Sequence, residues 1–305
     1  MDRISFGSRS LYQPPLWLTA STIMPELIPR ERVQLGRFPT PVHAFSIPGT
    51  EHLDLDFYIK RDDLSSFDLS GNKVRKLEFL LAEATNHDCD CVITVGGVQS
   101  NHCRATAVAA RQLGLDPFLI LRKPLNKDAS EPEPDLGLTG NLLFDRLVGA
   151  DVRLVSPSAY AMIGSDALCA QLEGQLRAEG RRPYVIPVGG SNKLGAFGYL
   201  QFVQELLETG GEEGGEGAVA PGAPYDHIVF GCGSGGTAAG IAIGVLLSPL
   251  HGRTMVHAVG VCDSPDVFYE HVRDVAVELG LDPALLGDVR SWLKVYEGQG
   301  VGYAK

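Results

Sequence analysis

Between Phe57 and Gly280 the sequence alternates short apolar runs with segments of helical periodicity, and this alternation constrains the fold more than any other feature. The runs that predict strands are DFYIKRDD, CVITVGG, PFLILR, DVRLVS, PYVIPVGG, HIVFGCGSGG and VHAVGVC. Apolar strands linked by helices are typical of parallel sheets that are covered by helices on both faces. We therefore expect an α/β protein with parallel-rich sheets.

Helical periodicity falls between these runs. The expected helices cover residues 70–87, 101–114, 138–150, 158–179, 195–207 and 265–280, with another directly after Gly236. Residues 1–36 contain prolines and show no regular pattern, and the low-complexity residues 208–224 predict a solvated loop. The length of 305 residues indicates about two domains.

Composition argues against several classes of partner. Lys and Arg number 26 against 37 Asp and Glu, and the formal net charge of −11 argues against nucleic acid and against an anionic membrane surface. No apolar run reaches the ~18 residues of a membrane span. The six cysteines and eight histidines show no metal-ligand spacing, so we expect no metal site.

Unpaired thiols favour a reducing compartment, and we expect the cytoplasm. The mitochondrion is the alternative, because Arg3 and Arg9 lie in a segment that is rich in Ser and Thr and poor in acidic residues.

The loop FGCGSGGTAAG follows an expected strand and opens an expected helix. Four glycines between Gly231 and Gly236 let backbone amides crowd around an anion, and Thr237 adds a hydroxyl. We interpret the loop as a phosphate site, with a turn that needs glycine only for packing as the alternative. The loop also matches G-x-G-x-x-G, with Asp263 at the end of the next strand, so a nicotinamide dinucleotide site is a rival interpretation.

Two further loops carry polar side chains at expected helix starts. Ser100 is placed to cap a helix that begins near Asn101, and Gln99 and Asn101 offer groups for a carboxylate or a ring hydroxyl, although capping alone also explains Ser100. In DLSGNKVRKLE, Lys73 and Lys76 share a face of the first helical turn. Cations there oppose the helix dipole, so an anion or an imine is expected beside them; a solvated basic helix start is the alternative.

One small ligand accounts for all three loops. Pyridoxal phosphate has an aldehyde for a lysine, a phosphate for a glycine loop and a ring hydroxyl for an amide. Burial and neighbouring positive charge lower the pKa of a lysine, which makes its amine a nucleophile towards an aldehyde. The predicted cofactor is therefore pyridoxal 5'-phosphate.

With these motifs the sequence resembles the D-cysteine desulfhydrase and 1-aminocyclopropane-1-carboxylate deaminase family, which are pyridoxal-phosphate enzymes with the fold of the tryptophan synthase β-subunit. The strings that carry the resemblance are GRFPTPVH, IKRDDLS, SGNKVRKLEFL, VGGVQSNHCRATAVAA, LTGNLL, PVGGSNKLGAFGY, GCGSGGTAAG and GQGVGYAK, in family order from Gly36 onward. The string SGNKVRKLE, with GGVQSNHCRATA, is more similar to the desulfhydrase branch.

The resemblance implies a role for each matching residue. The catalytic residues would be Lys73, which would hold the cofactor covalently and act as the base, with Ser100 and Tyr303. The cofactor would be bound by Lys73, Lys76, Asn101, Gly233, Ser234, Gly235, Gly236 and Thr237. The substrate would contact Gln99, Ser100, Asn101 and Tyr303, and Ser191 and Asn192 would close the other wall of the pocket.

The resemblance also implies two domains and a reaction. Residues 1–74 and 187–305 would form a large cofactor-binding domain, incomplete at its C-terminus, and residues 75–186 a small α/β domain, in a homodimer. The expected reaction is β-elimination on D-cysteine, an amino-acid substrate, to give pyruvate, hydrogen sulfide and ammonia. The alternatives are 1-aminocyclopropane-1-carboxylate deamination and cofactor binding without catalysis. Family members continue past the GYAK position, so the resemblance implies a shortened chain that lacks the residue separating the two activities.

Overall fold

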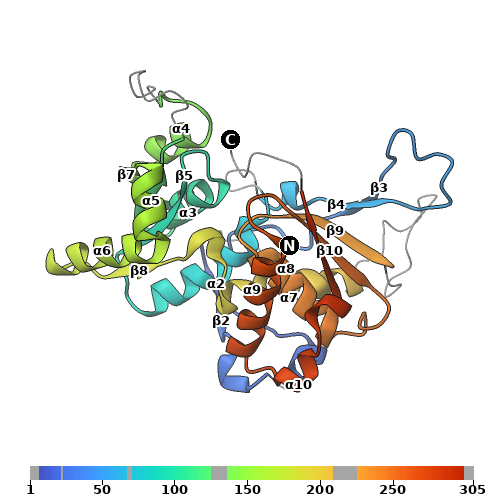
Figure 1. Cartoon of the computed structure of the whole chain (residues 1–305). Coiled ribbons are helices and arrows are strands. Elements are labelled where there is room, and N and C mark those ends of the chain that lie inside the picture. Colours follow the sequence, from blue (N-terminus) through green and yellow to red (C-terminus); the bar gives the residue numbers. More distant parts are fainter. Residues whose placement is uncertain (1–6, 22, 67–70, 125–135, 209–224, 299–305) are drawn as a thin grey trace, which may run out of the picture.

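The computed structural model describes residues 7–21, 23–66, 71–124, 136–208 and 225–298, which form two parallel sheets (Figure 1). The first has the order β7-β6-β5-β8 and the second the order β11-β10-β9. Their strands are β5 (Cys91–Gly97), β6 (Asp116–Arg122), β7 (Asp151–Val155), β8 (Pro183–Val185), β9 (His227–Cys232), β10 (Met255–Gly260) and β11 (Leu293–Glu297). Every pairing within these sheets is parallel, which confirms the α/β prediction.

Helices connect the parallel strands. They are α2 (Lys73–Asn86), α3 (Asn101–Gln112), α4 (Gly140–Leu147), α5 (Pro157–Ile163), α6 (Ser165–Ala178), α7 (Lys193–Glu208), α8 (Gly236–Leu247) and α9 (Pro265–Glu278), with the short α1 (Leu16–Thr19) and α10 (Pro283–Leu286). The single helix expected over residues 158–179 is wrong. Gly164, with a φ of +84°, separates α5 from α6, because a left-handed residue interrupts helical hydrogen bonding.

The N-terminal part is more regular than its sequence predicts. Strand β1 (Arg9–Leu11) pairs with β2 (Glu31–Val33), and β3 (Val42–Ala44) pairs with β4 (Tyr58–Lys60), both antiparallel. Single turns of 3-10 helix are η1 (Pro25–Leu27), η2 (Asp62–Leu64), η3 (Val188–Gly190) and η4 (Val289–Ser291). The run DFYIKRDD predicted β4, which pairs antiparallel and lies outside the parallel sheets. Strands β1, β2 and β3 were not predicted, because three residues with mixed side chains carry little period-2 signal.

The four-stranded sheet is buried on both faces, as the apolar runs predict. On β5, Val92 packs into a cluster with residues of α2 and α3, whereas Ile93 packs with Leu172 of α6. Successive side chains of a strand point to opposite faces, so the two clusters lie on opposite sides of the sheet.

The three-stranded sheet differs from the prediction. Val256 and Ala258 of β10 are fully buried in the cluster that includes α8 and α9. The opposite face of the described sheet is open, and Val229 of β9 keeps 67% of its surface exposed. The expectation of two covered faces is therefore wrong for this sheet within the described residues.

Helix α2 lies between the two sheets in Figure 1 and contacts α3, which follows β5 of the four-stranded sheet, and α7, which precedes β9 of the three-stranded sheet. It packs against α7 so closely that a Cβ on Gly198 would lie 2.3 Å from the backbone oxygen of Arg75. This contact fixes the start of α2, where Lys73 is located.

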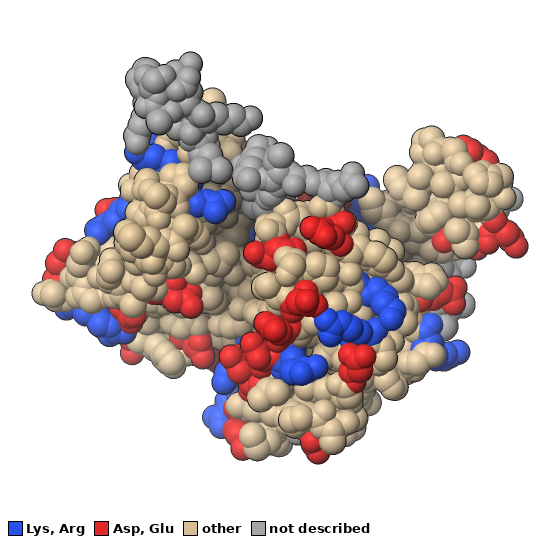
Figure 2. Space-filling view, viewed as in Figure 1, with Lys and Arg blue, Asp and Glu red and all other residues tan. Residues whose placement is uncertain are grey.

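Charge is mixed on the face shown in Figure 2, where acidic and basic side chains are interspersed over both lobes of the described surface. Among the described residues, no helix has both the length and the apolarity to cross a bilayer.

Candidate active site

Lys73 is the first residue of α2 and is half-buried. Burial lowers the pKa of its amine, because desolvation disfavours the charged form. No hydrogen bond or ion pair ties its Nζ to another described residue. A neutral, uncommitted amine is the form of lysine that attacks a carbonyl carbon.

Lys76 lies one turn further along α2 and is fully buried. Its Nζ donates to the backbone oxygen of Gly189, at 3.0 Å. Burial and, to a lesser extent, the charge of Lys73 hold the pKa of Lys76 well below its usual range. A second lysine at this depth, without a carboxylate partner among the described residues, is costly unless an anion offsets its charge.

The glycine loop meets Lys76 at the N-terminus of α8. A Cβ on Gly236 would lie 2.7 Å from Lys76 Nζ and 2.5 Å from Ser191 Oγ, so no side chain larger than hydrogen fits there. The backbone N–H of Gly236 donates to Ser191 Oγ at 3.2 Å, and the hydroxyls of Ser191 and Ser234 are 2.7 Å apart. Gly235 adopts a left-handed conformation, with a φ of +81°.

This donor set fits a phosphate. Gly236 leaves the space that a Cβ would fill, the start of α8 presents backbone amides, and Lys76 adds a buried amine. Asn72 Nδ2 donates to Thr237 Oγ1 at 3.2 Å, which ties the same loop to the residue before Lys73. The residues present therefore fit a group that carries an aldehyde and a phosphate.

Ser191 follows η3, and its hydroxyl accepts from the backbone N–H of Gly236 in the loop that heads α8. Its expected place in the wall of the pocket stays a prediction. The sequence pointed to Ser191 only through the string PVGGSNKLG. Its contact with Gly236 joins residues 45 positions apart, which no local pattern reveals.

The loop of residues 99–101 turns into α3. Ser100 is buried, and its Oγ accepts from the backbone N–H of Cys103 at 3.2 Å, so the predicted cap of α3 is confirmed. Asn141, at the start of α4, contacts both neighbours of Ser100: its Nδ2 donates to Gln99 O at 2.8 Å and to Asn101 Oδ1 at 2.9 Å.

His102 connects this loop to the lysines. The positive charges of Lys73 and Lys76 add to burial, and together they hold the pKa of His102 well below its usual value. Its Nε2 lies 3.0 Å from Thr94 Oγ1, and Thr94 in turn donates to the backbone oxygen of Ile186.

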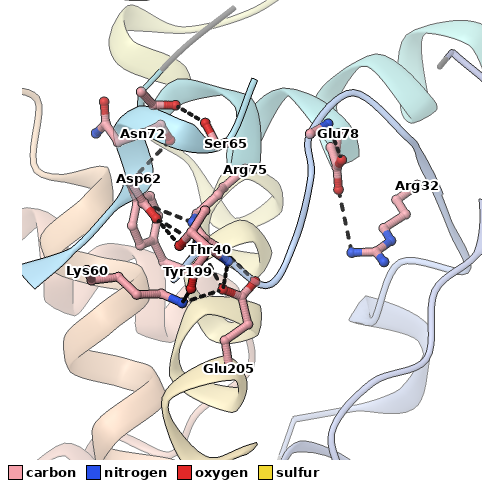
Figure 3. Close-up of polar contacts among 12 residues, drawn as sticks. Arg32, Thr40, Lys60, Asp62, Ser65, Asn72, Arg75, Glu78, Tyr199 and Glu205 are labelled. Carbon is pink, nitrogen blue, oxygen red and sulfur yellow. Dashed lines mark hydrogen bonds and ion pairs between the residues drawn. The ribbon is translucent and has the colours of Figure 1, made fainter. Parts of the chain in front are cut away.

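Arg75 does not belong to the site, although the sequence places it between the two lysines. Figure 3 shows its guanidinium held by Asp62 on one side and by Glu205 of α7 on the other. The two closest contacts are 2.7 Å to Glu205 Oε1 and 2.8 Å to Asp62 Oδ1. Lys60 Nζ also lies 2.9 Å from Glu205 Oε2. The expected basic helix start is thus partly neutralised by the protein itself.

The structure places Lys76 against the glycine loop and joins Thr237 to Asn72, the residue before Lys73. The charge of Lys73 also contributes to the lowered pKa of His102, which follows Asn101 directly. Tyr303 lies outside the described residues. Within the described part of the chain, no group of three or more His, Cys, Asp or Glu is placed to hold a metal ion.

Comparison with known proteins defines the class. The family model described as pyridoxal-phosphate dependent enzyme matches residues 33–304. The chain belongs to this family of pyridoxal-phosphate dependent enzymes.

Individual relatives narrow the position within the family. The chain is 45% identical over 300 residues to the bifunctional D-cysteine desulfhydrase/1-aminocyclopropane-1-carboxylate deaminase, mitochondrial, of Arabidopsis thaliana, covering 98% of this chain and 69% of that protein. It is 34% identical over 266 residues to a D-cysteine desulfhydrase of Salmonella choleraesuis, covering 86% and 74%. A crystal structure of an ACC deaminase homologue superposes with a TM-score of 0.70 at 32% identity, covering 90% and 75%.

The chain is shorter than these relatives. It spans 69% of the Arabidopsis protein and between 61% and 65% of related proteins from Thermotoga maritima and three Pyrococcus species. The matches bear out the predicted family, fold and cofactor dependence.

Proposed function

We propose that the chain catalyses β-elimination on D-cysteine, in which D-cysteine and water give pyruvate, hydrogen sulfide and ammonia. The observation that carries the proposal is the half-buried amine of Lys73, whose pKa is lowered by burial, one helical turn from a buried lysine at the glycine loop. The names of the Arabidopsis and Salmonella relatives support this substrate. Deamination of 1-aminocyclopropane-1-carboxylate to 2-oxobutanoate and ammonia is the second candidate, because the Arabidopsis name includes both activities.

In this proposal Lys76 and the loop of Gly233, Ser234, Gly235, Gly236 and Thr237 hold the phosphate of pyridoxal 5'-phosphate, and Lys73 holds its aldehyde carbon. Bound pyridoxal phosphate supplies a conjugated ring that spreads the negative charge left on a substrate α-carbon. The amine of Lys73 takes the α-proton, and burial, which lowers the pKa of this amine, favours the unprotonated form that the step requires.

The loop of residues 99–101 receives the substrate in the same scheme. Asn101 faces the ring hydroxyl, and Gln99 with Ser100 receives the substrate carboxylate. Ser100 Oγ accepts from the Cys103 amide and keeps its own hydroxyl proton, which it can donate to the substrate carboxylate. Tyr303 would line the pocket, as the family resemblance implies.

We propose the domain bounds given by the resemblance, 1–74 with 187–305 and 75–186. The four-stranded sheet and its helices α3 to α6 fall within residues 75–186, and the three-stranded sheet falls within 187–305. Helix α2 contacts both groups, so the boundary at residue 75 falls within this shared helix. A homodimer is part of the proposal and is tested by sedimentation of the purified chain.

We propose a reducing compartment, the cytoplasm, because the structure contains free cysteines and no disulfide among the described residues. The mitochondrion is the alternative, and the Arabidopsis relative is named mitochondrial. Imaging of the chain fused to a fluorescent protein at its C-terminus separates the two.

Parallel assays of one protein preparation test the activity. The chain is supplied with pyridoxal phosphate and given D-cysteine or 1-aminocyclopropane-1-carboxylate, and sulfide and 2-oxobutanoate are measured. We expect sulfide from D-cysteine, and at least a 10³-fold lower rate in Lys73→Ala, because the base and the covalent anchor are lost together. The reverse product pattern would favour deamination. A visible cofactor band with neither product would show binding without catalysis, and both activities would be rejected.

A further inference from the structure

We infer that Asn141, to which the sequence analysis assigned no role although it lies in the string LTGNLL, is a positioning residue that fixes the amide orientations of Gln99 and Asn101. Asn141 is the second residue of α4, about 40 positions further along the chain than Gln99 and Asn101. Its side-chain Nδ2 donates to Gln99 O at 2.8 Å and to Asn101 Oδ1 at 2.9 Å, and its backbone N–H donates to Gln99 Oε1 at 2.9 Å.

The backbone oxygen of Gln99 determines how the side-chain amides of Asn141 and Asn101 are oriented, because it shows which end of each amide is the nitrogen. Gln99 O can only accept, so the atom of Asn141 that contacts it is the nitrogen. The same nitrogen contacts the side chain of Asn101, and that contact must therefore be made by Asn101 Oδ1. The NH2 group of Asn101 is consequently the end of its amide that is turned away from Asn141.

Gln99 is fixed by the same logic. The backbone N–H of Asn141 can only donate, so it contacts Oε1 of Gln99, and Gln99 Nε2 donates to Thr139 O at 3.3 Å. Gly140 makes this possible: its φ is +55°, and a Cβ there would lie 2.3 Å from Gln99 Oε1. The turn of residues 139–141 is thus built around the Gln99 side chain.

The consequence rests on the proposed function, in which Asn101 faces the ring hydroxyl of pyridoxal phosphate. With Oδ1 committed to Asn141, Asn101 can offer that oxygen only N–H donors. A donor favours the ionised form of the oxygen it contacts and lowers the pH at which the bound cofactor loses its proton. Asn141 therefore sets the protonation of the bound cofactor without touching it.

The test compares Asn141→Asp with wild type by titrating the visible absorption band of the cofactor-loaded protein with pH. An aspartate has the same shape but no donor, so it attracts the NH2 group of Asn101 and turns Oδ1 towards the ring oxygen. We expect the midpoint of the band to rise by about one pH unit. Asn141→Ala, which removes the donor without repulsion, is expected to shift it in the same direction by less. Asn86→Asp, the same change at an exposed position, is the control and is expected to leave it unchanged.

A double-mutant cycle separates positioning from a loss of structure. In an Asn101→Ala background, Asn141→Asp is expected to add no further shift, because the amide through which it acts is absent. Thermal unfolding by circular dichroism identifies a variant that fails to fold, and Asn141→Ala then carries the comparison. A wild-type band whose midpoint does not move in Asn141→Asp or Asn141→Ala overturns the inference and leaves the proposed function standing. Absence of the band in wild type overturns both.

Discussion

Burial lowers the pKa of the Lys73 amine. The side chains of Cys232 and Cys103 act in the opposite direction, but their effect on this pKa is smaller. Lys76 and His102 are both perturbed by the charge of Lys73, and their pKa values are also lowered. Positive charge on these three groups is therefore costly unless a bound anion offsets it. Two predictions belong to the scale of single residues, one on Lys73 and one on Asp145.

The first prediction concerns the pH dependence of cofactor capture. Capture requires the neutral amine, and the pKa of Lys73 lies below the ordinary lysine value of 10.5. The capture rate, followed by the appearance of the visible band, is therefore expected to rise with pH and level off below 10.5. Lys193→Ala, which removes an exposed lysine at the start of α7, is the control and is expected to give the same profile. A rate that keeps rising up to 10.5 would mean that Lys73 is an ordinary surface lysine.

The second prediction concerns Asp145 of α4, whose carboxylate oxygens are buried without a hydrogen-bond partner in the described structure. Burial raises the pKa of Asp145 to about 7, and the charge of Arg104 opposes this only partly. Because the folded-state pKa lies above the unfolded one, the stability due to this group is complete at low pH and is lost as the pH rises towards 7. Replacing Asp145 with asparagine removes this titrating carboxyl group.

Asp145→Asn is accordingly expected to be more stable than wild type above pH 7, by about 1–2 kcal/mol, with the difference vanishing towards pH 4. Urea unfolding at pH 5 and pH 8 measures it. Asp54→Asn, at an exposed site, is the control. If the free energies of unfolding of Asp145→Asn and wild type differ by the same amount at pH 5 and pH 8, the titration of Asp145 is ruled out.

At the scale of elements, the crossing of α2 and α7 decides where Lys73 sits. A Cβ on Gly198 would meet the backbone of Arg75 at 2.3–2.4 Å, and backbone cannot rotate away as a side chain does. The guanidinium of Arg75 is paired with Glu205 of α7 at the same crossing (Figure 3). The two helices are therefore joined by backbone contact and by a buried ion pair.

Gly198→Ala is expected to lower the free energy of unfolding by about 2 kcal/mol or more, because the helices must separate. Gly174→Ala is the matched control. It lies within α6 with no atom inside 4 Å of the added Cβ, so it is expected to stabilise the protein by about 0.5–1 kcal/mol. Urea unfolding measures both. A Gly198→Ala variant as stable as wild type would show that the crossing is not tightly packed.

Several elements could be predicted from the sequence because their signals are local. The apolar run from Cys91 gave β5, and Ser100 marked the start of α3 through its cap. The break at Gly164 was missed because one glycine inside a helical pattern does not reveal its φ. Strands β1 to β3 were missed because each is short and lies in a segment without an apolar run.

At the scale of the whole molecule, the site joins segments that are far apart in the sequence. Lys76 and Gly189 are 113 positions apart, and Gln99 and Asn141 are 42 apart. The sequence predicted which residue types belong to a pyridoxal-phosphate site, but not that Ser191 reaches the start of α8 or that Arg75 is neutralised by Glu205. Such partners depend on how helices and sheets pack, which local patterns do not encode.

The account as a whole depends on a covalent bond at one lysine among several. The direct measurement is borohydride reduction of the chain after addition of pyridoxal phosphate, followed by proteolysis and mass spectrometry of the peptides. We predict one pyridoxyl adduct, on the peptide that contains Lys73 and at that residue, and its loss in Lys73→Ala. An adduct at Lys76 or at another lysine, with Lys73 unmodified, would contradict the account.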